Sequence, residues 1–227
     1  NDGLLRLDTD AAAGMQDVLA IFTAQDVGEK FMPEVNPLLD LQQDLRFALM
    51  ARTQVDHAGQ PVAMVIARTQ AAARAAAEAV QLDIEAQDVV VDFEGAEAVT
   101  RVAFQSGELA RDAVTVAQTR IGCPRVVAMT MEPRALVAEP HAEAASLTVW
   151  CGSQAPSRMQ SDVTALLAPE VRQVHVITPN VGGAFGAKSS VYPEELLVCW
   201  AAWRLQRALR WTSTRSEEFA SAMHGRG

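Results

Sequence analysis

Apolar runs in the first part of the chain predict strands interrupted by one helix. Residues 18–22 predict a strand, and residues 62–67 predict a second, buried one, because almost no polar residue breaks that run. Thr69 is a good N-cap for an alanine-rich helix over residues 70–80, and residues 82–84 return to a strand. The order strand–turn–strand–helix–strand predicts an α/β unit.

Shorter patterns fill the rest of this unit. The sequence predicts a brief helix at residues 11–13 and a helical turn at 23–26, capped by Thr23. It then predicts an exposed loop with prolines at 28–44, a strand at 48–55 and a turn at 57–61.

The second part of the chain predicts strand pairs and two helices that begin with proline. Pro156 and Pro193 suit the first position of a helix, so we expect helices over residues 157–167 and from Pro193 to near Leu205. The remaining expectations are strands at 114–121 paired with 125–131, at 134–139 paired with 144–151, and at 171–177 and 209–212, a helical segment at 214–222, and no closing element in residues 224–227.

A change of composition suggests two domains. The pattern of the first unit breaks after residue 88, and small polar residues follow, so we place a boundary between Phe93 and Leu109. We expect an α/β domain over residues 1–100 and an α+β domain over residues 101–227. The predicted fold class is therefore mixed α/β.

Charge and composition exclude several partners. The 227 residues carry a net charge of −9, which argues against nucleic acid and against an anionic membrane surface. No apolar stretch is long enough to span a bilayer. Cys123, Cys151 and Cys199 form no C-x-x-C pair, so we expect three buried thiols in a reducing, cytoplasmic compartment and no metal site built from them. The first residue is not Met, and we expect a processed chain or a piece of a longer one.

Three glycines within residues 182–186 are the strongest chemical signal. Glycine adds no buried area, but it allows a positive φ and a close backbone approach, and the N–H groups of such a loop can hold anionic oxygens. Two alternatives stay open. Residues 182–189 match a P-loop with one glycine replaced, although the next helix is expected only at Pro193. The loop could also be a structural turn with Phe185 plugging the core.

Two further turns favour a ligand site. Residues 152–156 form a small-residue loop that leads from a strand into a helix, and residues 131–134 form a short turn. Turns at the strand ends of one α/β layer can converge on one ligand.

The same segments carry a family resemblance. Residues 179–188 resemble the G-G-G-F-G-x-K loop of the molybdenum-containing subunit of the xanthine dehydrogenase/aldehyde oxidase family, which includes aerobic carbon monoxide dehydrogenase large chains. Residues 131–135 are similar to the family's M-E-P-R-A turn, and residues 153–156 to its T-Q-x-P loop. Residues 56–63 resemble the G-Q-P-V-A segment of its hammerhead domain. The remaining matches lie at 192–195 and 207–226.

The resemblance implies a hydroxylase in which water is the source of oxygen, acting on an aldehyde, an N-heterocycle or a similar small substrate. It implies a molybdopterin cofactor with molybdenum, in bacteria often as the cytosine dinucleotide, and electron transfer through 2Fe–2S clusters to FAD on partner subunits of a complex that can form a homodimer. By motif, Gln154 would bond an oxo ligand of the metal, and Gly183, Ala184, Phe185 and Gly186 would hold the cofactor. Phe185 and Ser189 would line the substrate pocket.

The chain also departs from the family pattern. Ala184 replaces a usual glycine, and Ser189 stands where some members have a substrate-orienting Glu, which disfavours purine substrates. The family's catalytic base is a Glu in a late G-x-G-E segment, so we expect no catalytic residue within these 227 residues. We expect a hammerhead domain without its N-terminal part, the first part of a molybdopterin-binding domain, and no activity from the chain alone. The alternatives are a degenerate P-loop nucleotide-binding protein and a non-catalytic module that binds a partner.

Other titratable residues are expected to be structural. The histidines are too scattered to form a ligand set and are expected at the surface or hydrogen-bonded; they are His57, His141, His175 and His224. The carboxylate pairs 194–195 and 217–218 lie at predicted helix starts, where the helix dipole favours negative charge.

Overall fold

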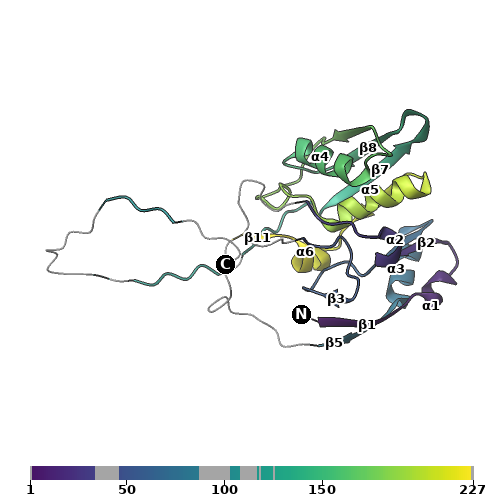
Figure 1. The fold of residues 1–227 in the computed structure, drawn as a ribbon, viewed down its shortest axis with the longest axis horizontal. Coiled ribbons are helices and arrows are strands. Elements are labelled where there is room, and N and C mark those ends of the chain that lie inside the picture. The colour runs from purple at the N-terminus through teal and green to yellow at the C-terminus, as the bar shows by residue number, and fades with distance from the viewer. Residues whose placement is uncertain are drawn as a thin grey trace.

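A computed structural model gives the arrangement of the chain in residues 2–33, 46–86, 103–107, 117, 119–124 and 126–225 (Figure 1). Its elements in the first part are β1 (Asp2–Asp8), α1 (Asp10–Ala13), β2 (Val18–Thr23), α2 (Ala24–Val27), β3 (Gln54–Val55), β4 (Ala63–Ala67), α3 (Gln70–Ala79) and β5 (Gln81–Glu85). The second part holds β6 (Val126–Val127), β7 (Ala135–His141), η1 (Ala142–Ala144), β8 (Ser146–Cys151), α4 (Pro156–Leu167), β9 (Gln173–Ile177), α5 (Pro193–Leu205), β10 (Leu209–Thr212), α6 (Arg215–Ser221) and β11 (His224–Gly225).

The first part builds two small antiparallel sheets. β2 pairs with β4, and β1 lies between β3 and β5. Thr23 begins α2 through a capping box with Asp26, and the Thr69 hydroxyl accepts the N–H of Ala72 at the start of α3, as predicted. Together these elements confirm the predicted strand–helix–strand unit.

The second part is organised on a four-stranded mixed sheet with the order β10–β7–β8–β9. The 3₁₀ turn η1 connects β7 to the antiparallel β8, and α4 connects β8 to the parallel β9. Leu136 and Ala138 on β7 lie opposite Cys151 and Val149 on β8, and all four are buried, so one face of the sheet supplies core.

Helix α5 is the centre of the core. Every residue from Glu195 to Ala202 is buried, which is the pattern of a helix enclosed on all sides. One side of α5 packs on β7 and β10, and the N-terminal elements β2 and α2 lie on its other side (Figure 1). There the rings of Phe22 and Trp200 meet edge to face, with centroids 5.0 Å apart. Burial therefore joins the two parts of the chain through α5.

Several local predictions are wrong. Most of the strand expected over residues 48–55 is irregular, because Leu49 and Met50 are buried by packing rather than by strand pairing. In the strand 62–67, only Ile66 is fully buried. The three thiols also differ, since Cys123 is exposed while Cys151 and Cys199 are buried.

The pairing expected between residues 114–121 and 125–131 is wrong in the part that the structure describes. Only β6 forms there, and it pairs with β11 near the end of the chain. β11 also overturns the expectation of no closing element in residues 224–227. The predicted boundary between Phe93 and Leu109 falls almost entirely outside the described residues and stays a prediction. Within the described residues, no helix combines the length and apolarity needed to cross a membrane.

Candidate functional site

Three turns meet at one edge of the four-stranded sheet. β8 and β9 are parallel, so residues 152–156 and the long loop after Ile177 leave the sheet at the same edge. β7 runs antiparallel to β8, so the residues just before Ala135 lie at that edge too. We call residues 131–134 the Glu132 turn, residues 152–156 the Gln154 turn and residues 182–188 the glycine loop. The three turns therefore meet as expected, and a ligand shared by them stays a prediction.

Hydrogen bonds join the three turns directly. The N–H of Glu132 donates to the carbonyl of Gly182 at 3.1 Å, and the N–H of Gln154 donates to the carbonyl of Lys188 at 2.9 Å. Lys188 Nζ in turn donates to the carboxylate of Glu132 at 2.7 Å. Arg215 holds the Glu132 turn from outside, because its guanidinium donates to the carbonyls of Thr130 and Met131.

The glycine loop presents free backbone donors. Two of its N–H groups are used, since Gly182 donates to Glu132 and Ala187 donates to Ala184. Between them, the N–H groups of residues 183–186 donate no hydrogen bond to another described residue. Gly183, Phe185 and Gly186 have positive φ values of +96°, +49° and +88°, and turns built from such residues can form concavities in which N–H groups bind an anion.

The side chain of Phe185 points to solvent. It is 78% exposed although its backbone is in the left-handed region, which bulky residues adopt only at a cost. The interpretation of Phe185 as a core plug is therefore wrong. Met131 on the neighbouring turn is also exposed, at 89%.

The other two predicted site residues flank the glycine loop. Gln154 is exposed, and its side-chain amide makes no hydrogen bond within the described part of the chain, while its backbone is fixed by Lys188. Ser189 is exposed as well, but its hydroxyl donates to the carbonyl of Gly186 at 2.6 Å. The structure thus brings Gln154, residues 183–186 and Ser189 to one edge. Whether each binds the ligand assigned to it stays a prediction.

The P-loop alternative does not fit this geometry. A P-loop lysine stands at the start of a helix with its ammonium free for phosphate. Here Lys188 Nζ is buried against Glu132, and α5 begins five positions later, at Pro193. The lysine is therefore occupied, whereas the N–H groups of residues 183–186 donate to no described residue.

Arg134 is a buried hub that the sequence analysis missed. Its Nε donates to Glu218 at 2.9 Å, and its terminal nitrogens donate to Ser221 at 2.6 Å and to Glu194 at 3.4 Å. Glu194 and Glu218 therefore do more than interact favourably with helix dipoles. They also neutralise the buried charge of Arg134, which has no access to water. The sequence showed an arginine as the last residue of the Glu132 turn and two carboxylate pairs downstream, but no local pattern connects them.

Burial and hydrogen bonds shift several pKa values near the site. The hydrogen bond from Lys188 lowers the pKa of Glu132, so this carboxylate is ionised at neutral pH. Burial raises the pKa of Glu195 to about 7, and that of the Cys151 thiol to about 11. Glu195 caps α5 by accepting the N–H of Tyr192 at 3.0 Å. The raised pKa of Cys151 keeps its thiol protonated at neutral pH.

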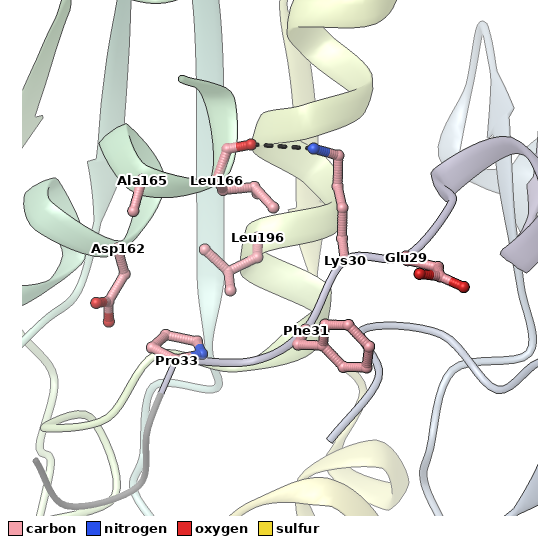
Figure 2. Close-up of a pocket in the computed structure, with 8 residues that line it drawn as sticks. All are labelled: Glu29, Lys30, Phe31, Pro33, Asp162, Ala165, Leu166 and Leu196. Atoms are coloured by element: carbon pink, nitrogen blue, oxygen red, sulfur yellow. Dashed lines mark hydrogen bonds between the residues drawn. The ribbon is translucent and has the colours of Figure 1, made fainter. Parts of the chain in front are cut away.

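A separate pocket of about 290 Å³ lies between residues 29–33 and helices α4 and α5 (Figure 2). Lys30 crosses it and donates to the carbonyl of Leu166 at 3.2 Å, which occupies its ammonium.

Within the described residues, no group of three or more His, Cys, Asp or Glu side chains is arranged to hold a metal ion. His57, His141 and His175 are exposed, as predicted, whereas the side chain of His224 lies outside the described set. We therefore assign the candidate site to the three turns.

Two family models match the chain. Residues 3–88 match the a/b hammerhead domain of aldehyde oxidase and xanthine dehydrogenase, and residues 93–227 match the molybdopterin cofactor-binding domain.

Relatives of known function match almost the whole chain. It is 27% identical to the nicotine 6-hydroxylase large subunit of Paenarthrobacter nicotinovorans, over 96% of this chain and 29% of the relative. It is 30% identical to the aldehyde oxidoreductase molybdenum-binding subunit PaoC of Escherichia coli strain K12, over 91% of this chain and 28% of the relative. The structure is similar to quinoline 2-oxidoreductase from Pseudomonas putida 86, with a TM-score of 0.87 and 28% identity over 99% of this chain and 31% of that one.

The chain thus spans under a third of the length of these relatives. Both the hammerhead fold and the start of the cofactor-binding fold are present, and the three turns lie in the matched cofactor-binding region. The chain belongs to the aldehyde oxidase and xanthine dehydrogenase family of molybdopterin oxidoreductases.

Proposed function

We propose that this chain is part of the large subunit of a molybdenum hydroxylase, which hydroxylates an aldehyde, an N-heterocycle or a similar small substrate with oxygen from water. The family membership supports the class of enzyme. The observation that carries the proposal is the row of free N–H groups at residues 183–186, beside the free amide of Gln154.

These residues fit an anionic cofactor. A molybdopterin presents phosphate and metal-bound oxygens, which are hydrogen-bond acceptors and carry negative charge. Bonds from Gly182 and Lys188 to Glu132 already hold the two ends of the glycine loop, so binding would cost little reorganisation. The amide of Gln154 adds a neutral donor at the same edge. A carboxylate side chain in the glycine loop or in place of Gln154 would repel such an anionic cofactor.

Each residue then has a defined task. When bound, the cofactor would supply the metal-based oxidation of an electron-poor carbon. The N–H groups of Gly183, Ala184, Phe185 and Gly186 would bind its oxygens, and Gln154 would donate to an oxo ligand. The exposed ring of Phe185 would form an apolar wall against a flat substrate, with Ser189 beside it. Because Ser189 already donates to Gly186, its hydroxyl oxygen would serve as an acceptor.

The rest of the enzyme would lie outside these 227 residues. We propose a catalytic Glu in another part of the large subunit, and partner subunits that carry 2Fe–2S clusters and FAD. Relatives named as a large subunit and as subunit gamma of a dehydrogenase complex support a multi-subunit assembly. We also propose the cytosine dinucleotide form of the cofactor, a cytoplasmic location and a homodimer of the whole complex. The 227 residues alone would be inactive and would hold little metal.

The test uses the full-length protein, purified with its partner subunits. Elemental analysis should find one molybdenum per large subunit, and an aldehyde or N-heterocycle should be hydroxylated with label from H₂¹⁸O. Gln154→Ala should lower kcat by about two orders of magnitude, as removal of one preorganised donor does. Full-length protein without molybdenum, or one that incorporates oxygen from O₂, would overturn the proposal. A 227-residue fragment that binds stoichiometric molybdenum and turns over substrate would overturn the claim of inactivity.

A further inference from the structure

Both ends of the glycine loop are tied to one carboxylate oxygen. Glu132 Oε2 accepts the N–H of Gly182, the first residue of the loop, at 2.7 Å. The same oxygen accepts Nζ of Lys188, the last residue of the loop, also at 2.7 Å. The backbone of Glu132 adds a third bond, from its N–H to the carbonyl of Gly182. One side chain therefore closes the loop at its base.

The chain is packed closely around this ion pair. The side chain of Lys188 is 3% exposed, and a buried ammonium is tolerated only next to a counter-charge. A Cβ added to Gly182 would lie 2.6 Å from Cβ of Glu132, and one added to Gly152 would lie 3.2 Å from Oε2. Glycine at both positions thus lets two backbones reach the pair.

The segment between the two ends makes few hydrogen bonds of its own. Within the described part of the chain its N–H groups at 183–186 donate none, although the carbonyls of Ala184 and Gly186 accept the N–H groups of Ala187 and Ser189. The bulky Phe185 has a positive φ of +49°. Such a conformation persists only where its surroundings impose it. Lys188 also fixes the Gln154 turn, because its carbonyl accepts the N–H of Gln154.

We propose that Glu132 and Lys188 form a positioning pair that holds the free N–H groups of residues 183–186, and with them Gln154, in the arrangement that receives the cofactor. The pair is not proposed to touch the cofactor or the substrate. This inference rests on the proposed function, and it adds the residues that prepare the site.

The decisive variant is the double substitution Glu132→Gln/Lys188→Met in the full-length protein. It removes both charges, so it leaves no unpaired ammonium in the interior, and such a replacement by neutral groups of similar volume is easier to tolerate because Glu132 is only half-buried. Gln can still accept the N–H of Gly182, whereas Met cannot donate, so only the Lys188 end of the loop is released. Glu132→Ala is the second variant and releases both ends. Glu170→Gln is the control, because this carboxylate accepts a hydrogen bond from Trp203 Nε1 away from the turns.

Two quantities are measured: molybdenum per large subunit, and amide hydrogen exchange in peptides covering residues 182–188 of cofactor-free protein. In the double variant we expect the hydrogen-bonded amides of this segment to exchange about tenfold faster, because those of residues 183–186 are already unprotected. The melting temperature and exchange outside the three turns should stay as in the wild type. Molybdenum content should fall about tenfold, as for residues that orient metal ligands from behind. Glu132→Ala should show both effects more strongly, and Glu170→Gln neither.

The outcomes separate this inference from the proposed function. If the wild type is loaded and the double variant holds as much molybdenum with unchanged exchange, the positioning role is overturned while the proposed function stands. If the wild type carries no molybdenum, the proposed function fails, and exchange alone decides the pair's role: faster exchange in residues 182–188 supports it, and unchanged exchange overturns it.

Discussion

The guanidinium of Arg134 lies over the ring of Tyr192, with Cζ 3.9 Å from the ring centroid. This contact joins the residue two positions after Glu132 to the residue that precedes α5. Tyr192 extends the connection, because its hydroxyl donates to the carbonyl of Ala187 and accepts the N–H of Met223. The edge that carries the candidate site is therefore supported from below by a charged and aromatic cluster.

Loss of the Arg134 side chain should destabilise the protein strongly. Arg134→Ala leaves Glu218 buried and Glu194 partly buried without their cation, and breaking a buried ion pair typically costs about 3–5 kcal/mol. Arg134→Lys should recover only part of this, since an ammonium cannot reproduce the fork of bonds. Urea unfolding measures the difference. Arg6→Ala, at an exposed pair with Asp8, is the control and should cost under about 1 kcal/mol.

Glu195 should make stability depend on pH. Its pKa rises from 4.5 to about 7 on folding because the carboxyl is buried. The folded state therefore binds the proton more tightly than the unfolded state, so this group's contribution to the free energy of unfolding falls as pH rises from 4.5 to about 7. Glu195→Gln mimics the neutral form and should be more stable than the wild type at about pH 8 but not at about pH 4.

The effect of Glu195 must be measured as the difference between the wild type and Glu195→Gln. Glu132 and Glu218 also make the free energy of unfolding depend on pH, but in the opposite direction. Their pKa values are lowered, so their contribution to stability is lost as pH falls. Denaturant unfolding at both pH values gives the difference. Glu143→Gln replaces an exposed carboxylate and should show no such difference. An equal effect of Glu195→Gln at the two pH values would contradict the prediction.

Gly182→Ala should disturb the candidate site without a change of charge. The new methyl group would lie 2.6 Å from Cβ of Glu132, so one of the two backbones must move. We expect a loss of about 1–3 kcal/mol in the free energy of unfolding, together with lower molybdenum content in the full-length protein. Gly122→Ala adds its methyl group to open space and should change neither quantity. Wild-type stability and loading in Gly182→Ala would show that the close approach is unnecessary.

Phe185 should matter for substrate and not for folding. Its side chain is 78% exposed, and its φ of +49° is one that Asn adopts more readily. Phe185→Asn should therefore keep the free energy of unfolding within about 0.5 kcal/mol of the wild type or raise it. If the ring forms a wall of the substrate pocket, KM should rise about tenfold, because apolar contact is lost. A large loss of stability would instead place Phe185 in a packing role.

Much of the local structure could be predicted from the sequence. The starts of α3, α4 and α5 follow from Thr69, Pro156 and Pro193, because capping and proline geometry act within a few residues. The turn composition of the site was also visible, since glycine and small residues serve a close backbone approach wherever they occur.

The tertiary structure decided what those segments contact. Glu132 and Lys188 are 56 positions apart, Arg134 and Glu218 are 84 apart, and β6 finds its partner in β11 near the end of the chain. No local pattern encodes such pairs, because each charge or strand edge has many complementary partners in the sequence. Burial selects the pair, because an ammonium or guanidinium enclosed near α5 is stable only when a carboxylate that the fold brings beside it neutralises its charge.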